Sequence, residues 1–246
     1  MNRNPADYRD RIYRNSILKN DLKVFNVTVR ETDIFISADS DLTQIAFASV
    51  LRLRSSLETY IIAHPAFLTS LKPVPYDELA PEIVREMMRA SGKAGVGPMA
   101  AVAGAVAEHV GRDLLSHTRN LIIENGGDIY MKSLRDIHVG LFAGRSPLSN
   151  RVTIKVRKEE MPLGVCTSSG TVGHSLSFGY ADACCITSRS VALADAAATA
   201  VGNLVKSKQD IQIALKAGME IEGVLGIVII VGDQLGAIGD IELAKV

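Results

Sequence analysis

The 246-residue sequence contains no tryptophan, and aromatic residues make up only 5% of it. Cysteine is also scarce, with three residues gathered at Cys166, Cys184 and Cys185. Three clustered cysteines are too few for a disulfide framework. Cys184 and Cys185 are neighbours in a strand-like run, where their side chains would point to opposite faces. Two interpretations stay open: small buried side chains, or a reactive thiol that faces a binding site.

Neither sign of charge is in excess, because 27 Lys and Arg residues balance 27 Asp and Glu residues. A chain without a basic surplus has little attraction for a phosphate backbone, so no nucleic-acid partner is expected. Long apolar runs are missing as well, which argues against membrane insertion. The N-terminal charges are not followed by an apolar stretch or a cleavage site, so we expect a cytoplasmic protein. The oligomeric state stays open, a homo-oligomer included.

The composition is otherwise that of a globular protein, with 47% hydrophobic and 22% charged residues. The first half predicts strands, then helices, then strands, and the second half repeats that order. This arrangement favours an α+β fold in which helices pack on one face of an antiparallel sheet. We expect a single compact domain over residues 1–246, with two pseudo-repeated halves at about 20–135 and 136–246.

The individual elements follow from hydrophobic periodicity, turn residues and helix-end signals. Asp41 is expected to be a helix N-cap, Pro98 to occupy the first position of a helix, and Gly111 to follow the end of that helix. The predicted helices are residues 41–64, 76–91, 95–111, 190–205 and 208–218, and the predicted strands lie in 25–38, 120–132, 136–144, 151–158, 163–169, 180–188 and 223–246.

Two adjacent glycines stand between strand-like residues in the segment "ENGGDIYM", residues 124–131. Gly126 and Gly127 in this setting are a strong signal for a two-residue hairpin turn. The missing side chains would also let a ligand approach the backbone, with polar contacts from Asn125 and Asp128. The two interpretations are compatible with each other.

A stretch rich in glycine and hydroxyl groups, "TSSGTVGHSLSFG", covers residues 167–179. It cannot form a core, and its backbone N–H groups suit phosphate or another anion. An ordinary flexible loop has the same composition. Ser168 and Gly170 are candidate binding residues. Ser169 and His174 are candidate catalytic residues that would supply a nucleophile or move a proton.

The segment "ALADAAATA", residues 192–200, is almost pure alanine but carries Asp195 and Thr199. Four residues make about one helical turn, so the carboxylate and the hydroxyl would lie on one face of a helix. The plain alternative is that Asp195 only accepts a hydrogen bond from a neighbouring backbone group.

These three segments, in this order, resemble the motifs of the ApbE superfamily, whose founding members split FAD and attach FMN to a protein threonine. The resemblance rests on "NGGD", on "SSG" followed by His174, and on "ALADAAATA", and it covers the chain from about residue 95 to its end. It implies a tandem T-fold-like architecture. It also implies that Asp195 and Thr199 hold Mg²⁺ against the pyrophosphate of FAD, since hard oxygen ligands suit this ion.

The resemblance further implies FAD, FMN or another nucleotide as the small-molecule partner. Because the motifs would serve one ligand, we expect regions 97–131 and 167–200 to meet around one cleft. The sequence departs from the transferases after His174, where "SLSFG" replaces their Asp-Pro-x-Thr-Gly segment. With no export signal, the chain is most similar to a short, cytoplasmic branch of the superfamily. Transfer of flavin to a protein threonine is therefore expected to be weak or absent.

Three functions remain as hypotheses. The first is a Mg²⁺-dependent transferase or hydrolase that acts on a nucleotide or flavin pyrophosphate. The second is a flavin- or nucleotide-binding protein without catalytic activity. The third is a sulfur-handling protein that uses Cys166, Cys184 or Cys185.

Overall fold

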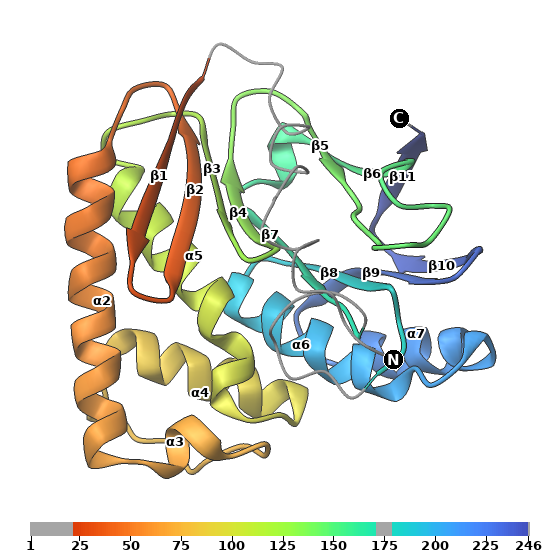
Figure 1. The fold of residues 1–246 in the computed structure, drawn as a ribbon, viewed down its shortest axis with the longest axis horizontal. Helices are drawn as coiled ribbons and strands as arrows, with labels where there is room; N and C mark the ends of the chain where they lie inside the picture. The colour runs from red at the N-terminus through yellow and green to blue at the C-terminus, as the bar shows by residue number, and fades with distance from the viewer. Residues whose placement is uncertain (1–21, 171–178, 246) are drawn as a thin grey trace.

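A computed structural model describes residues 22–170 and 179–245 of the chain. Its central element is an antiparallel sheet of eight strands in the order β1-β2-β3-β4-β7-β8-β9-β10. Helices cover one face of this sheet, and a three-stranded sheet in the order β11-β6-β5 lies on the other side (Figure 1). The predicted α+β class, with helices on one face of an antiparallel sheet, is confirmed.

The bounds of the elements are as follows. The large sheet contains β1 (Lys23–Val29), β2 (Thr32–Ala38), β3 (Leu121–Asn125), β4 (Asp128–Lys132), β7 (Leu163–Ser168), β8 (Ala183–Ser188), β9 (Val224–Val231) and β10 (Gln234–Gly239), and the small sheet contains β5 (Ile137–Gly140), β6 (Val152–Val156) and β11 (Glu242–Lys245). The helices are α2 (Thr43–Ala63), α3 (Ala66–Thr69), α4 (Glu82–Ala94), α5 (Val102–Leu114), α6 (Val191–Leu204) and α7 (Ile211–Met219), with 3₁₀ turns η2 (Pro98–Ala101), η3 (Lys158–Glu160) and η4 (Lys208–Asp210).

The strand order of the large sheet is the same in its two parts. A hairpin, one or more helices and a second hairpin form β1 to β4, and the same series forms β7 to β10. The two four-stranded parts meet where β4 pairs with β7. This order is what two pseudo-repeated halves would give, and the division into halves stays our proposal.

Two predicted hairpins form. The sequence 25–38 predicts the first with its turn around Glu31 and Thr32, and in the structure β1 and β2 are joined one residue earlier, at Arg30 and Glu31, with Val29 opposite Thr32. In the second, β3 and β4 are joined by Gly126 and Gly127, whose φ angles are 68° and 107°. These positive angles are costly for residues with a Cβ, which explains the glycine pair.

Some predicted boundaries are wrong at the residue level. The helix predicted at 76–91 begins only at Glu82, because Pro81 stands before it in an extended conformation. Asp41 is not the N-cap of α2. Leu42 holds that position, and Asp41 accepts a hydrogen bond from the Thr43 N–H at 2.9 Å.

The other differences concern Gly111 and the C-terminal strands. Gly111 lies inside α5 rather than after it, because the ring of Tyr130 on β4 occupies the space that a Cβ would need. The segment 223–246, predicted as a strand pair, also contains a third strand. That strand, β11, pairs with β6 in the small sheet.

Two hydrophobic cores lie on opposite faces of the large sheet. The first fills the space between the sheet and the helices, and the second lies between the two sheets. Adjacent residues of β8 therefore serve different cores: Cys184 packs in the first and Cys185 in the second. This is the alternation of faces that the sequence predicted for these two cysteines.

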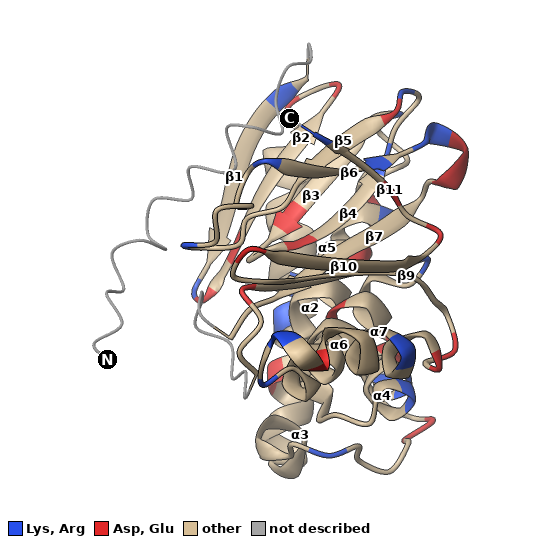
Figure 2. Ribbon diagram, turned by 90° about the vertical axis from the view of Figure 1, so that its right-hand side faces the viewer, with Lys and Arg blue, Asp and Glu red and all other residues tan. Residues whose placement is uncertain are grey.

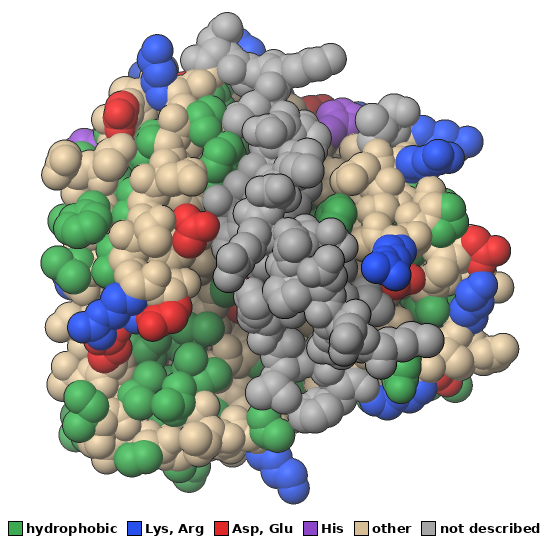
Figure 3. Space-filling view, viewed as in Figure 1, with side chains coloured by type: hydrophobic (Ala, Val, Ile, Leu, Met, Phe, Trp, Pro, Cys, Tyr) green, Lys and Arg blue, Asp and Glu red, His purple; other side chains and the backbone are tan. Residues whose placement is uncertain are grey.

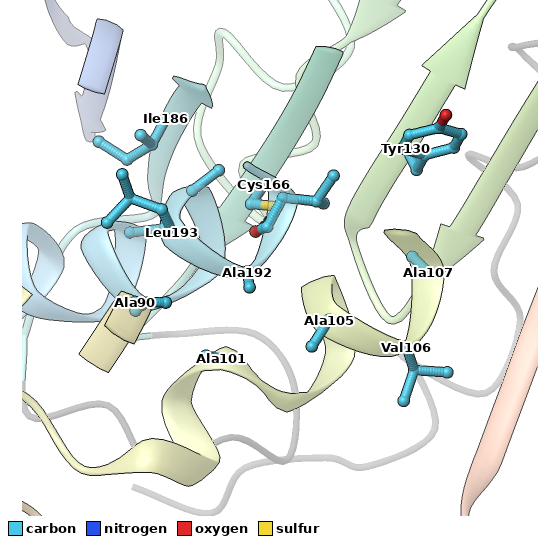
Figure 4. Close-up of a cluster of buried hydrophobic side chains, with 14 of the residues drawn as sticks. Ala90, Ala101, Ala105, Val106, Ala107, Tyr130, Cys166, Ile186, Ala192 and Leu193 are labelled. Atoms are coloured by element: carbon cyan, nitrogen blue, oxygen red, sulfur yellow. Dashed lines mark hydrogen bonds between the residues drawn. The ribbon is translucent and has the colours of Figure 1, made fainter. Parts of the chain in front are cut away.

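Helices α5 and α6 cross at very short range in the first core. Small side chains line the contact, among them Ala101 and Ala105 from the α5 region and Ala192 from α6 (Figure 4). At Gly104 a Cβ would collide with the carbonyl oxygen of Val191 and lie 2.9 Å from the Cβ of Asp195. The alanines of α6 are thus explained by close packing, since Ala192, Ala196 and Ala197 are fully buried.

The surface carries both signs of charge. On the face in Figure 3, Lys and Arg side chains are interspersed with Asp and Glu. Figure 2 shows the same mixture on a second side, where the small sheet lies in front. Within residues 22–170 and 179–245, no helix combines the length and the hydropathy needed to cross a membrane.

We predict that Gly104→Ala lowers the free energy of unfolding by about 1 to 3 kcal/mol, because its methyl group would force α5 and α6 apart. Gly92→Ala on α4 is the matched control. No atom lies within 4 Å of its added Cβ, so it should stabilise the protein by about 0.5 to 1 kcal/mol. Urea unfolding of both variants measures the difference, and equal midpoints for the two would refute the tight crossing.

Candidate functional site

The sequence motifs converge where four backbone segments meet. The turn at Gly126 and Gly127 lies beside the end of β7, where Asp128 pairs with Cys166. Helix α6 passes the same place, and Asp195 on its second turn reaches the start of α5. The structure thus brings together parts of the 97–131 and 167–200 regions, as expected for one shared site.

Asp195 is bound to the first turn of α5. Its Oδ2 accepts a hydrogen bond from the Gly104 N–H at 2.9 Å, and the Ala103 N–H also donates to this carboxylate. Helix α5 has no side-chain cap of its own, so Asp195 supplies that cap from a different helix. The structure therefore contains the hydrogen bond from a backbone group that the sequence analysis gave as the alternative role of Asp195. The carboxylate has this structural role whatever else it binds.

Asp128 and Asp195 are two acids close enough to interact electrostatically, and Asp128 is buried while Asp195 is partly buried. Burial, followed by the charge of Asp195, raises the pKa of Asp128 well above its ordinary value. Burial raises the pKa of Asp195 to about 7, although the N–H groups of Gly104 and Ala103 act in the opposite direction. Two like charges in one apolar place favour a bound proton or a bound cation.

Asp128 is also held from its own sheet. It is 7% exposed, hydrogen-bonded to the Cys166 thiol, and accepts a bond from the Thr167 backbone. The Cys166 thiol donates to the Val191 carbonyl oxygen at 3.5 Å. Cys166 therefore links Asp128 on β4 to the first residue of α6.

The other binding candidates lie close by but make mostly structural contacts. Asn125 donates from Nδ2 to the Ala103 carbonyl oxygen at 3.0 Å. The Gly127 N–H donates to Oε1 of Glu124 at 2.8 Å, so this backbone donor is already used. Gly126 is exposed at the tip of the turn.

The end of β7 reaches the second half of α6. A Cβ on Gly202 would lie 3.9 Å from Oγ of Ser168, and Thr199 is one turn before Gly202. The Gly170 N–H donates to the Ala181 carbonyl oxygen at 2.9 Å. Thr199, Ser168 and Ser169 are all partly exposed. His174 lies outside the described residues, together with most of the segment that follows "SSG".

All three cysteines are free and buried. Burial raises the pKa of each thiol, and that of Cys185 reaches about 12. A thiol that stays protonated at neutral pH is a weak nucleophile. These conditions favour the interpretation of small buried side chains over a reactive thiol.

Two functional candidates, Glu108 and Glu124, were missed by the sequence analysis. Glu124 is fully buried beside the glycine turn, and Glu108 is 5% exposed on α5. Oε2 of Glu108 accepts a hydrogen bond from the Val191 N–H at 2.8 Å. Each sits in a segment whose periodicity predicts only a strand or a helix, so no local signal marks it.

Glu108 belongs to a network of charged groups that joins α4 and α5. Arg112 donates to Glu108 Oε1 at 2.5 Å and to Glu86 Oε1 at 2.7 Å. The other Glu86 oxygen lies 2.7 Å from Nε2 of His109. Burial alone would raise the pKa of Glu86, but its interactions with His109 and Arg112 outweigh the effect of burial and bring this pKa down to about 2.

The site contains few metal ligands of its own. Among the described residues, no group of three or more His, Cys, Asp or Glu side chains is arranged to hold a metal ion. A cation at this place would need oxygen ligands from elsewhere, such as a hydroxyl, water or a phosphate.

Solved structures with the same fold define the class of protein. The Pseudomonas stutzeri flavinyl transferase ApbE, in its apo form, superposes with a TM-score of 0.55 at 13% identity and covers 89% of this chain and 94% of that one. The apbe protein of Thermotoga maritima gives a TM-score of 0.55 at 14% identity, over 87% of this chain and 96% of that one. At these identities the likeness establishes a shared fold of the ApbE type.

The family follows from the sequence. The family model described as "AbpE bacteria" matches residues 15–238, and the chain belongs to this family. The UPF0280 protein MJ1526 of Methanocaldococcus jannaschii is 43% identical over 226 residues, which are 89% of this chain and 92% of that protein. A UPF0280 protein of Methanosarcina acetivorans is 42% identical over 216 residues, 87% of this chain and 85% of that protein. The resemblance to the ApbE superfamily is confirmed.

We predict that Glu86→Gln flattens the acid limb of the stability curve. The folded-state pKa of Glu86 is lowered from 4.5 to about 2, so the stability it contributes is present above pH 4.5 and is lost as the pH falls toward 2. The contribution is on the order of 2 to 3 kcal/mol. Urea unfolding from pH 7 to pH 2 measures it.

Glu82→Gln is the control for this experiment. Glu82 lies on the same helix, its side chain is 67% exposed, and its Oε1 is 3.8 Å from the Arg112 guanidinium. The substitution therefore removes the same charge from a side chain that is largely in solvent. An unchanged acid limb in Glu86→Gln would show that the network does not hold Glu86 ionised.

Proposed function

We propose that this protein binds a flavin or nucleotide diphosphate together with Mg²⁺ at the Asp128–Asp195 site, and that it cleaves or transfers the bound pyrophosphate. One observation carries the proposal: the buried Asp128 and the partly buried Asp195 lie close enough for the charge of Asp195 to raise the pKa of Asp128. A divalent cation would relieve this concentration of negative charge.

The residues present fit magnesium. This ion is commonly held by one or two carboxylates, while water and substrate phosphates complete its shell. Asp195 and Thr199 are our proposed ligands, with Asp128 close enough to add its charge to the site. When bound, magnesium would neutralise charge on the phosphate oxygens. The lack of a larger ligand cluster among the described residues agrees with a site that the ligand itself completes.

The class of ligand is supported by the Pseudomonas stutzeri flavinyl transferase ApbE, which shares this fold. In our proposal Gly126 and Gly127 admit the ligand to the backbone, and Ser168 and Gly170 contact it with polar groups. Asn125 and Asp128 flank the same turn. Ser169 and His174 remain the proposed groups for proton transfer or nucleophilic attack.

The second candidate function is binding of the flavin or nucleotide without catalysis. The observation that favours it is the "SLSFG" segment, which lacks the carboxylate of the transferases. The third hypothesis, a sulfur-handling protein, is not carried further because burial raises the pKa of all three thiols.

We predict that Asp195→Asn lowers the Mg²⁺-dependent gain in ADP affinity by about tenfold or more, equal to at least about 1.4 kcal/mol. The amide keeps the shape of the side chain and an oxygen that can accept from Gly104, but it loses the charge. Calorimetric titration of ADP with Mg²⁺ and then with chelator, into both proteins, separates metal-assisted from metal-free binding.

Two further variants secure this experiment. Thr199→Val removes the proposed hydroxyl ligand without touching the cap on α5, so it tests the site even if Asp195→Asn is unstable. Asp240→Asn removes a charge from an exposed residue and should behave as wild type. Equal Mg²⁺-dependent gains in wild type, Asp195→Asn and Thr199→Val would eliminate the proposed metal site.

We also predict that the protein does not attach FMN efficiently to a threonine peptide in the presence of FAD and Mg²⁺. Mass spectrometry of the peptide tests transfer, and release of FMN and AMP from FAD and water tests hydrolysis. An active ApbE-type transferase serves as the positive control. Hydrolysis without transfer would favour a hydrolase, bound yellow flavin without either product would favour a binding protein, and robust flavinylation would contradict the prediction.

A further inference from the structure

Helices α5 and α6 cap each other's first turns. Asp195 of α6 accepts from the Gly104 N–H near the start of α5, at 2.9 Å. Glu108 of α5 accepts from the N–H of Val191, the first residue of α6, at 2.8 Å. Moving along α5 from Gly104 to Glu108 therefore means moving back along α6 from Asp195 to Val191, so the two helices cross with opposite directions.

The position of the α6 N-terminus is fixed by contacts to three neighbours. Glu108 holds the Val191 N–H, and the Val191 carbonyl oxygen receives the Cys166 thiol. A Cβ at Gly164 on β7 would lie 2.9 Å from the Cα of Val191, so the strand is in close contact as well. Among these contacts, the one with Glu108 is made by a carboxylate, which accepts the hydrogen bond of the Val191 N–H.

Glu108 is itself held in place from α4. Its second oxygen is paired with Arg112, and Arg112 bridges to Glu86. Both oxygens of Glu108 are thus engaged, and the side chain is 5% exposed. Because both oxygens of Glu108 already accept hydrogen bonds within the protein, we expect its effect on the site to pass through α6.

We propose that Glu108 is a positioning residue for the metal-binding face of α6: by fixing Val191 against α5, it sets the place of Asp195 and Thr199. This inference rests on the proposed function. Asp195 is one turn from Val191 on the same helix. A displacement of Val191 that moves the first turn of α6 would therefore move the Asp195 carboxylate by a similar distance. Groups that hydrogen-bond directly to a metal ligand commonly change metal affinity by about 10- to 100-fold when they are removed, and we expect the lower end of this range for Glu108, which acts through the backbone of α6.

The test compares the Mg²⁺-dependent gain in ADP affinity across variants of Glu108. Glu108→Ala removes the acceptor and should lower the gain by about tenfold, while ADP affinity in chelator stays within about twofold of wild type. Glu108→Gln keeps an oxygen for the Val191 N–H and should retain most of the gain. Rescue by glutamine distinguishes the hydrogen bond from the charge.

A loss of stability alone must not be mistaken for positioning. Ser49→Ala is the control, because it removes the bond from Ser49 to Asp113 between α2 and α5, away from the crossing with α6. It should lower the melting temperature but leave the Mg²⁺-dependent gain unchanged. If Glu108→Ala does not fold, Glu108→Asp withdraws the carboxylate by one methylene group and should give a partial loss of the gain.

The outcomes separate this inference from the proposed function. A full gain in Glu108→Ala or Glu108→Asp, in a protein where Asp195→Asn loses it, would overturn the positioning role and leave the metal site intact. A full gain in Asp195→Asn and Thr199→Val would overturn the proposed function first. A loss in Glu108→Ala with rescue in Glu108→Gln, and no change in Ser49→Ala, would support the inference.

Discussion

The reciprocal capping of α5 and α6 is the interaction on which the rest of the site depends. Asp195 satisfies the first turn of α5, and Glu108 satisfies the first residue of α6. Gly104 at the crossing leaves no room for a side chain, so the two backbones approach closely enough for these bonds to form. Favourable charge at helix N-termini adds to both bonds. A short crossing of this kind fixes the buried carboxylate of Glu108 and the partly buried carboxylate of Asp195.

The same arrangement exposes Asp195 to two opposing effects on its ionisation. Its hydrogen bonds to Ala103 and Gly104 favour the ionised form, whereas burial beside Asp128 favours the neutral form, and burial is the larger effect. A structural cap that needs no ligand could use a neutral acceptor in this position. Capping of α5 does not require a second acid nearby. The presence of Asp128 is therefore the reason that we propose a cation site in addition to the cap.

The fold and the location of the site could be predicted further than its chemistry. Turn and periodicity signals are local, so the Gly126–Gly127 hairpin and the helix carrying Asp195 were found from residue types alone. Glu108 was missed because its importance comes from Val191, a residue 83 positions away. The predicted start of α4 and the predicted end of a helix before Gly111 were wrong, because Pro81 and the Tyr130 ring override the helical pattern. The strand β11 was missed because its partner, β6, is distant in sequence.

The seam between β4 and β7 has a thermodynamic consequence. One side of the seam supplies the turn with Asp128, and the other side supplies Ser168 and, through α6, Asp195 and Thr199. A ligand that contacts both sides can bind only when the seam is closed. By linkage, its binding free energy adds to the work needed to separate the two four-stranded parts, so the occupied protein resists partial opening more than the empty one. Protection of the β4 and β7 amides from hydrogen exchange would therefore be a sensor of occupancy even for a ligand that produces no spectral change.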